Sequence, residues 1–205
     1  MLRLSFETGD ADGLRRYLGE KGAQTPASVE RGKDLNLHLT FKDPDRHWID
    51  FVEYTAASPH TKSRGKKLSE ARVSERILHA GLTIADVPAS DKLYKDILGF
   101  SEIWRGGANE NTLSWINMKV PDGTDYIEYM LVSGPVDRQR LGTLHHIALV
   151  VPDIQKALEI VRARSSETEG RKMQSPRVGR NNRWQLNLFD PDGSRVELME
   201  PHPMR

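Results

Sequence analysis

A turn followed by a strand recurs near the end of each third of the chain, and this repeat limits the fold more than any other feature. Residues 43–51 read DPDRHWIDF, residues 190–198 read DPDGSRVEL, and residues 121–129 read PDGTDYIEY, a looser copy. Each copy places a turn rich in Pro, Asp or Gly before an alternating strand, as in the second arm of a β-hairpin. Three units of about sixty residues would explain a length of 205 residues, which falls between one average domain and two.

The beginnings of the second and third units also match. HAGLTIAD at 79–86 and HIALVVPD at 146–153 both run from a histidine through six residues to an aspartate, which predicts a strand and then a helix N-cap. Apolar residues follow at helical spacing: Leu14, Tyr17 and Leu18 after Asp10; Leu93, Tyr94, Ile97 and Leu98 after Asp86; Ile154, Ala157, Leu158 and Val161 after Asp153. Gly22 and Gly99 would end the first two helices. Each unit therefore predicts the order strand, helix, three strands, a βαβββ module in an α+β fold.

This periodicity divides the chain into a module at 1–55, a linker at 56–75 and a pair of modules within 76–205, at 76–132 and 143–200. The linker contains the basic stretch HTKSRGKKLS at 60–69. Basic residues can bind nucleic acid, but no aromatic residues interleave these, so we interpret the stretch as an exposed linker.

The composition of the chain excludes several kinds of partner and several kinds of chemical site. A net charge of +1 gives no strong field for nucleic acid or for an anionic membrane, so we expect neither partner. The longest aliphatic run is far shorter than a membrane helix, and the N-terminus lacks a signal-peptide core, which predicts a cytoplasmic protein. Cysteine is absent, which excludes disulfides, thiolate metal sites and a cysteine nucleophile. Any metal must therefore be held by histidines and carboxylates.

Four such residues occupy matching places in the second and third units. His79 and His146 begin the first strands, and Glu128 and Glu197 lie in the last strands, with spacings of 49, 18 and 51 residues. Alternation places all four on the sheet face that points away from the helices. Two imidazoles and two carboxylates suit one six-coordinate divalent ion, Fe, Mn, Co, Ni or Zn, with two positions left for water or substrate.

The chain resembles the vicinal oxygen chelate superfamily, which contains glyoxalases, bleomycin resistance proteins and extradiol dioxygenases. The matching stretches are HAGLTIAD at 79–86, LYKDILGF at 93–100, IEYML at 127–131, HHIALVVPD at 145–153 and DPDGSRVEL at 190–198. The resemblance implies that the two modules pair into a half-open barrel around a metal, with His79, Glu128, His146 and Glu197 as ligands. The order His–Glu–His–Glu is most similar to that of the glyoxalases.

The resemblance also implies a function. The first expectation is a metal-dependent lyase or isomerase that stabilises an enediolate of a small substrate, with Glu128 or Glu197 moving the proton. One alternative is an extradiol-type dioxygenase, for which two histidines and one carboxylate suffice. Another is a non-catalytic binding protein like the bleomycin resistance proteins.

Further residues are candidates for the substrate site. Arg105 and Arg183 are candidates for binding a substrate carboxylate, and Met130 for lining the cleft wall. Trp115 is a candidate for substrate stacking, although barrel packing explains the tryptophans better. The substrate itself stays open.

The first unit departs from the pattern, because Arg3 stands at the histidine position and Asp50 at the glutamate position. We interpret it as a degenerate module without its own metal, which either packs on the others or pairs with its copy in a homodimer. The remaining histidines, His38, His47, His60 and His202, are expected to be structural, and His145 is expected to point toward the helices.

Overall fold

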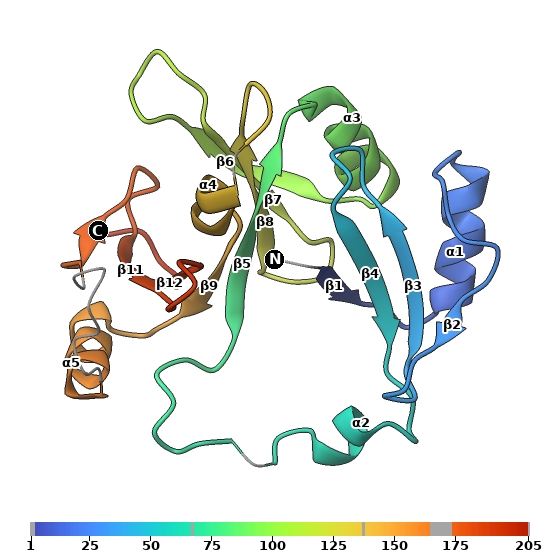
Figure 1. The fold of residues 1–205 in the computed structure, drawn as a ribbon, viewed down its shortest axis with the longest axis horizontal. Helices are drawn as coiled ribbons and strands as arrows, with labels where there is room; N and C mark the ends of the chain where they lie inside the picture. Colours follow the sequence, from blue (N-terminus) through green and yellow to red (C-terminus); the bar gives the residue numbers. More distant parts are fainter. Residues whose placement is uncertain (1–2, 67, 137, 165–173, 205) are drawn as a thin grey trace. The chain divides into compact units, whose positions relative to one another are not determined.

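The computed structural model describes residues 3–66, 68–136, 138–164 and 174–204 (Figure 1). The chain forms two compact units. One contains Met1–Glu70 together with Pro88–Leu98, and the other contains Ala71–Val87 together with Gly99–Arg205. No helix in the described residues is long and apolar enough to span a membrane.

The first unit is built on a four-stranded sheet in the order β1-β4-β3-β2. Its strands are β1 (Leu4–Glu7), β2 (Glu30–Arg31), β3 (Leu37–Lys42) and β4 (Trp48–Glu53), and its helices are α1 (Ala11–Glu20) and α2 (Pro59–Ser63). β1 pairs with β4 in parallel, and the other pairs are antiparallel. The Asp10 side chain caps α1 by accepting from the amide of Gly13, as the sequence predicts. The unit thus contains an additional βαβββ module.

The second unit is built on an eight-stranded curled sheet in the order β10-β11-β12-β9-β5-β8-β7-β6. The strands are β5 (Ile77–Ile84), β6 (Ser101–Gly106), β7 (Trp115–Lys119), β8 (Tyr126–Leu131), β9 (His146–Val150), β10 (Arg177–Val178), β11 (Trp184–Phe189) and β12 (Arg195–Met199). β5 and β9 pair antiparallel at the centre, and each also pairs in parallel with the last strand of its own module, β8 or β12. The two halves of the sheet therefore repeat one another, and the predicted fold class is confirmed.

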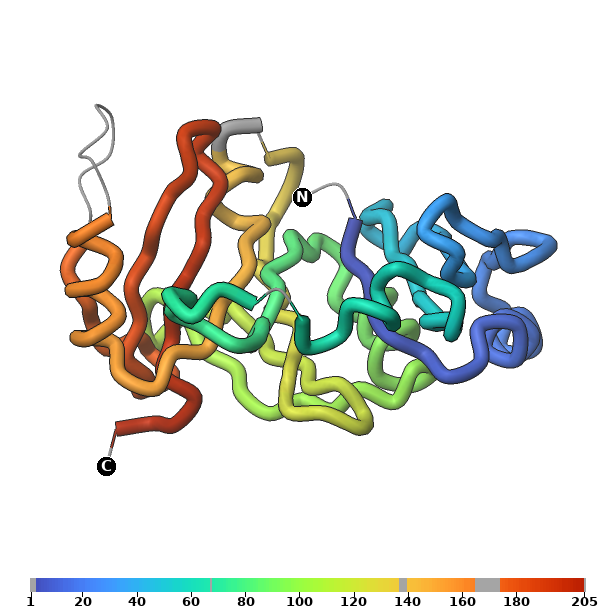
Figure 2. Tube along the Cα trace, turned by 90° about the horizontal axis from the view of Figure 1, so that it is seen from below, coloured from blue at the N-terminus to red at the C-terminus, as the bar shows by residue number. Residues whose placement is uncertain are grey.

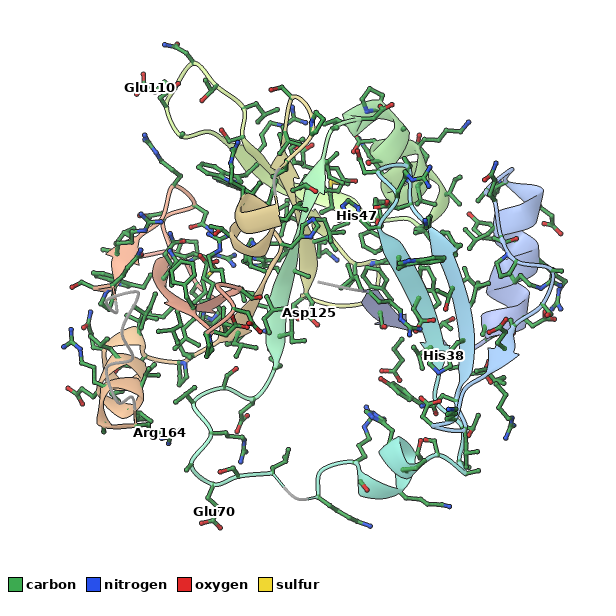
Figure 3. All side chains as sticks on the ribbon, in the orientation of Figure 1. His38, His47, Glu70, Glu110, Asp125 and Arg164 are labelled. Carbon is green, nitrogen blue, oxygen red and sulfur yellow. The ribbon has the colours of Figure 1, made fainter. Side chains whose placement is uncertain are left out.

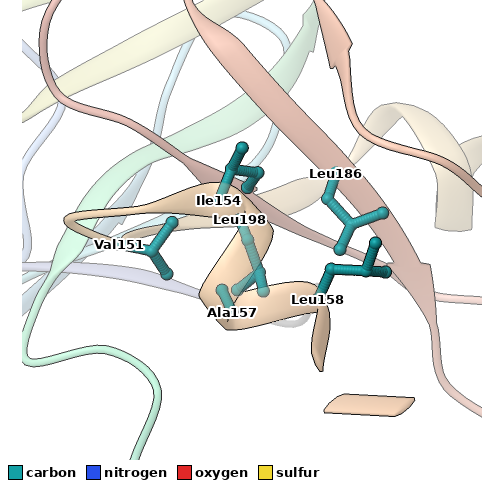
Figure 4. Close-up of a cluster of buried hydrophobic side chains, with 6 residues drawn as sticks. All are labelled: Val151, Ile154, Ala157, Leu158, Leu186 and Leu198. Atoms are coloured by element: carbon teal, nitrogen blue, oxygen red, sulfur yellow. The ribbon is translucent and has the colours of Figure 1, made fainter. Parts of the chain in front are cut away.

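Helices α4 (Arg138–Leu144) and α5 (Ile154–Arg164) belong to the second unit. Figure 2 shows α5 beside β11 and β12. The buried side chains between them form one cluster of Val151, Ile154, Ala157, Leu158, Leu186 and Leu198 (Figure 4). The predicted apolar face of this helix is thus the face that packs on the sheet, and burying each large side chain contributes roughly 1.5–3 kcal/mol.

The helix of the second module differs from the expectation. It begins as α3 (Val87–Asp91) and continues as the π-helix η1 (Lys92–Ile97), so that Leu93 and Tyr94 are buried while Ile97 and Leu98 are only half-buried. Within the first unit, the Tyr94 hydroxyl donates to Asp43 over 2.9 Å. The sequence predicts that this helix belongs to the module at 76–132. In the structure, Pro88–Leu98 belongs to the same compact unit as the N-terminal residues.

Candidate metal centre

The four predicted metal ligands lie on the four central strands of the eight-stranded sheet. β5 carries His79, β8 carries Glu128, β9 carries His146 and β12 carries Glu197. The β5 and β9 strands run side by side in opposite directions, with Gly81 opposite His146. The last strand of each module lies on the outer side of its first strand, so the glutamates flank the two histidines.

Three of these side chains form a compact cluster. The Nε2 atoms of His79 and His146 are 3.0 Å apart, and Glu128 Oε2 lies 3.5 Å from the His146 Nε2 and 4.0 Å from the His79 Nε2. One ligand atom from each residue lies within 4.8 Å of the other two. Two imidazoles and one carboxylate that converge in this way can hold a divalent metal ion.

The fourth predicted ligand, Glu197, contacts this cluster from one side. Its Oε2 lies 3.5 Å from His79 Nε2, but the compact cluster consists of the other three residues. The Glu197 side chain is 5% exposed, which keeps a carboxylate beside the imidazoles and away from bulk water. A ligand role for Glu197 stays a prediction.

Burial sets the protonation of the cluster. It lowers the pKa of His79 well below the usual range and, together with the charge of Arg195, lowers the pKa of His146 to about 3. Burial also raises the pKa of Glu197, and with the Glu197 charge it raises the pKa of Glu128 to about 8. The imidazoles are therefore neutral, as metal ligands must be. The charge of Arg195 acts to lower the pKa of both carboxyl groups, but burial outweighs it, and a bound cation would further favour their ionised form.

Local contacts orient the two histidines. The His146 Nδ1 donates to the carbonyl of Leu144 over 2.7 Å, which makes its Nε2, directed into the cluster, the acceptor of the ring. The His79 ring stacks on Tyr126 with ring centroids 4.6 Å apart. A Cβ atom at Gly81 would lie 2.2 Å from the His146 ring, so only glycine leaves room for this imidazole over β5.

The sequence interpretation missed two repeated positions. Asn117 lies opposite Glu128 across β7 and β8, and Asn187 lies opposite Glu197 across β11 and β12. Both are buried, and the Oδ1 of each has no partner among the described residues. Their spacing could have indicated these positions, because in both modules the asparagine precedes its glutamate by a similar number of residues.

A cavity of about 560 Å³ opens beside the cluster and contains Glu128 and Glu197 in its wall. Two predicted substrate residues, Trp115 and Met130, also line it. Arg105 instead binds Glu102 through its Nε over 2.6 Å and lines a neighbouring cavity of about 460 Å³. Arg183 is not in the lining of the larger cavity, although its positive charge helps to lower the pKa of His79. The substrate roles of all four stay predictions.

In the N-terminal module, a hydrogen-bond network around Asp50 occupies the positions that correspond to the metal cluster. Asp50 accepts from Arg3 over 3.2 Å, from Thr40 over 2.9 Å and from Ser5 over 3.3 Å, and it lies 2.9 Å from His38 Nδ1. Figure 3 labels His38, which projects from β3. Arg3 and Asp50, at the positions predicted to have lost their ligands, thus form an ion pair within a hydrogen-bond network.

The other histidines have local partners. His47 lies 2.8 Å from the Asp43 carboxylate, and His60 stacks on Tyr54. His145 Nε2 lies 2.9 Å from the Thr83 hydroxyl, even though the next residue contributes to the metal cluster. The contacts of His47 and His60 agree with the structural roles expected for them, and the expected direction of His145 toward the helices stays a prediction.

Comparisons of the sequence place these features among known proteins. The family model described as "Glyoxalase/Bleomycin resistance protein/Dioxygenase superfamily" matches residues 76–198. The lactoylglutathione lyase of Haemophilus influenzae is 31% identical over 129 residues, which cover 61% of this chain and 92% of that protein. The matched family region contains all four residues of the candidate centre.

Solved structures share the fold over nearly the whole chain. A variant of homoprotocatechuate 2,3-dioxygenase from B. fuscum is 23% identical with a TM-score of 0.67, and the match covers 96% of this chain but 54% of the dioxygenase. The Mn(II)-bound glyoxalase from Novosphingobium aromaticivorans is 16% identical with a TM-score of 0.65, and the match covers 98% of this chain and 62% of the glyoxalase. The chain therefore spans about half the length of the dioxygenase and under two thirds of that glyoxalase.

Proposed function

Because the chain belongs to the glyoxalase/bleomycin resistance protein/dioxygenase superfamily, we propose that it is a divalent-metal-dependent lyase or isomerase acting on a small substrate with neighbouring oxygens. One observation carries the proposal: His79, Glu128 and His146 present three ligand atoms within 4.8 Å of one another. The cavity of about 560 Å³ beside them has room for a small molecule.

The donor set fits a metal ion. Neutral imidazoles and carboxylates suit Fe, Ni, Zn, Mn and Co, and a nearby cation would favour the ionised forms of Glu128 and Glu197, whose pKa values are raised by burial. When bound, a divalent ion would act as a Lewis acid on substrate oxygens. His79 and His146 would hold it together with Glu128, and Glu197 is proposed as the fourth ligand.

The two glutamates are proposed to move the proton. Both carboxyl groups line the cavity, so each can reach a substrate carbon on its own side. Burial raises the pKa of Glu128 to about 8 in the metal-free centre, and a bound ion would lower it again, so a glutamate would have to move off the ion to accept a proton. Trp115 and Met130 are proposed to form the apolar wall that excludes water from the reacting atoms. Arg105 and Arg183 are proposed to attract a substrate carboxylate.

A specific observation also favours a second candidate, an extradiol-type dioxygenase. The fold match to the homoprotocatechuate dioxygenase extends over 96% of the chain, including the N-terminal module, whereas the match to the lactoylglutathione lyase covers 61%. Two histidines and one carboxylate are also the ligands that non-haem iron oxygenases use. The lyase or isomerase stays the first proposal because sequence identity above 30% supports it.

Metal analysis and oxygen consumption distinguish these activities. The protein is purified without chelator, its metal content is measured, and the metal-loaded protein is assayed with lactoylglutathione by following the thioester. A lyase or isomerase is expected to act without oxygen uptake and to lose activity in His146→Ala. Oxygen uptake with catechols in an iron-loaded sample would support the dioxygenase, and failure to bind any divalent metal would contradict both.

We also propose that the protein is a cytoplasmic homodimer in which the N-terminal module pairs with its copy. Support comes from the module's four-stranded sheet and from the cavity of about 640 Å³ on it, lined by Arg3, His38, Thr40 and Trp48. Light scattering tests this assembly, because a monomer at high concentration would contradict it.

A further inference from the structure

The two halves of the metal centre differ at one repeated position. Tyr126 and Arg195 each stand two residues before a glutamate of the centre and directly opposite a histidine of the centre on the neighbouring parallel strand. In the second module this residue is the aromatic ring that stacks on His79. In the third module it is a guanidinium beside His146. The repeat therefore places an uncharged group on one side of the centre and a fixed positive charge on the other.

The contacts of Arg195 point into the centre. Its Nη2 lies 3.0 Å from the Nε2 of His146 and 2.7 Å from the Nδ1. Its Nε is buried and has no hydrogen-bond partner among the described residues. A buried guanidinium nitrogen without a partner costs free energy, which a ligand that supplies an acceptor can recover.

The cavity beside the centre has an excess of positive charge. Arg177, Arg180 and Arg195 line it, against the carboxylates Glu128 and Glu197. The Arg180 guanidinium donates to the backbone carbonyl of Ala108 over 2.6 Å, a contact that leaves its charge uncompensated. A divalent ion would add further positive charge. Electrostatic complementarity then requires a negatively charged ligand in this cavity.

We propose that Arg195 is a specificity-determining residue, and that the substrate is a carboxylate with a second oxygen on the neighbouring carbon, a 2-oxo or 2-hydroxy acid. This inference rests on the proposed function, because the two neighbouring oxygens are those that the metal would bind. A guanidinium nitrogen donates a strong, charge-assisted hydrogen bond to a carboxylate, so the unpartnered Nε of Arg195 would bind the carboxylate oxygen that the metal leaves free. Tyr126 offers no such charge, so the anionic end of the substrate is directed toward the third module.

A matched pair of small ligands tests the charge preference directly. Glycolate and glycolamide both carry a hydroxyl beside a carbonyl carbon, but only glycolate is charged. Their binding to the Mn²⁺-loaded protein is measured by calorimetry, together with the Mn²⁺ affinity itself. The wild-type protein is expected to prefer glycolate by ~10-fold or more, because hydrogen bonds to a charged group are the strong ones.

Two substitutions assign the preference to Arg195. Arg195→Gln is expected to lose most of the preference for glycolate while still binding Mn²⁺, and Arg195→Lys is expected to retain part of the preference because the charge remains. Arg72→Gln, which removes an exposed arginine paired with Glu75, is the control for charge loss and should leave the preference unchanged.

Three results would overturn the inference. Equal affinities of the wild-type protein for glycolate and glycolamide would do so without any variant. An unchanged glycolate preference in Arg195→Gln, with Mn²⁺ still bound, would remove the role of Arg195 while leaving the proposed metal function intact. Failure of the wild-type protein to bind Mn²⁺ or other divalent ions would instead contradict the proposed function, and the inference with it.

Discussion

The N-terminal module and the paired modules use the same strand order to bring charged side chains together, but they balance the charge differently. In the N-terminal module, Asp50 receives hydrogen bonds from Arg3, Ser5 and Thr40 and contacts His38. In the paired modules, the corresponding strands bring together histidines and glutamates. Burial lowers the pKa of His79 and raises the pKa of Glu128, so it favours the uncharged form of each.

This difference shows what makes a repeated module a binding site. A buried carboxylate is stable when the protein supplies its own donors and a cation, as Arg3 does for Asp50. Where histidine replaces the arginine, the cation at that position is lost. Arg195 lies nearby, but the pKa of Glu128 is still raised to about 8, so a further cation from outside would favour the carboxylate. The same fold thus serves as a self-neutralised structural module or as a candidate metal centre, and five experiments test the distinction.

The largest effect is expected from His146→Ala. Zinc sites with four ligands bind with about 10–16 kcal/mol, so losing one ligand is expected to cost roughly 4 kcal/mol, or ~1000-fold in metal affinity. Metal titration in a competition assay measures this. The matched control is His145→Ala, because its Nε2 contacts Thr83 instead of the cluster, and its metal affinity should stay within a few-fold of the wild type. Equal losses in both variants would contradict the ligand role.

Asp50→Ala is expected to destabilise the N-terminal module by about 2–4 kcal/mol, because it leaves the partners of a buried carboxylate without an acceptor. Urea unfolding followed by Trp48 fluorescence measures the loss. Asp50→Asn, which keeps the size and one acceptor, should lose less. Metal affinity at the paired modules should not change. A large loss of metal affinity would contradict the claim that the N-terminal network is structural and separate from the metal centre.

Gly81→Ala tests the packing of the centre without changing a ligand. A Cβ at this position would lie 2.2 Å from the His146 ring and displace it, which is expected to weaken metal binding by ~10–100-fold, as loss of an outer-shell contact does. Gly19→Ala in α1 is the control, because nothing lies within 4 Å of a Cβ there. Unchanged metal affinity in Gly81→Ala would show that the His146 position is not required.

The pH dependence of metal affinity tests the raised pKa of Glu128 in the paired modules. Burial and the Glu197 charge raise the pKa of Glu128 to about 8, so below that pH the metal must displace one proton. The affinity is therefore expected to rise by about tenfold per pH unit between pH 6 and 8 and then to level off. Metal titrations at several pH values measure the slope, and a flat profile over this range would contradict the raised pKa.

The smallest effect concerns the pH dependence of stability, for which the two regions should have opposite signs. Burial disfavours the charged form of His38, but hydrogen bonds with Asp50 and Asp34 outweigh it and raise the pKa of this imidazole above its usual 6.5. The stabilisation that this provides is present below pH 6.5 and is lost as the pH rises through the raised pKa.

For His146, burial lowers the pKa to about 3, so metal-free protein should instead lose stability as the pH falls below 6.5. Imidazole proton shifts in NMR titrations measure both groups. A lowered pKa of His38, or a raised one of His146, would remove the contrast.

The sequence was sufficient to predict the architecture and the core of the site, because both depend on periodicity. Alternation along the strands placed His79, Glu128, His146 and Glu197 on one face, and the structure brings all four to the central strands. The apolar face of α5 was predicted for the same reason. Such patterns depend only on which residues follow each other along the chain.

Contacts that depend on geometry between strands were harder to predict. Arg195 and Asn187 were missed because their roles come from the residues opposite them on neighbouring strands. The contact of Arg105 with Glu102, three residues earlier, was likewise not predicted, and the substrate role of Arg105 stays a prediction. The π-helical turn after Asp91 changes which apolar residues are buried, and helical spacing alone does not indicate it.

The order in which the two charge networks can form follows from their places in the chain. Arg3, His38 and Asp50 all belong to the compact unit that is complete once Pro88–Leu98 has been synthesised, whereas His146 and Glu197 follow later in the chain. Domains that are complete early generally fold first during translation. The N-terminal network can therefore close first, because the strands β9 and β12, which carry His146 and Glu197, are synthesised later.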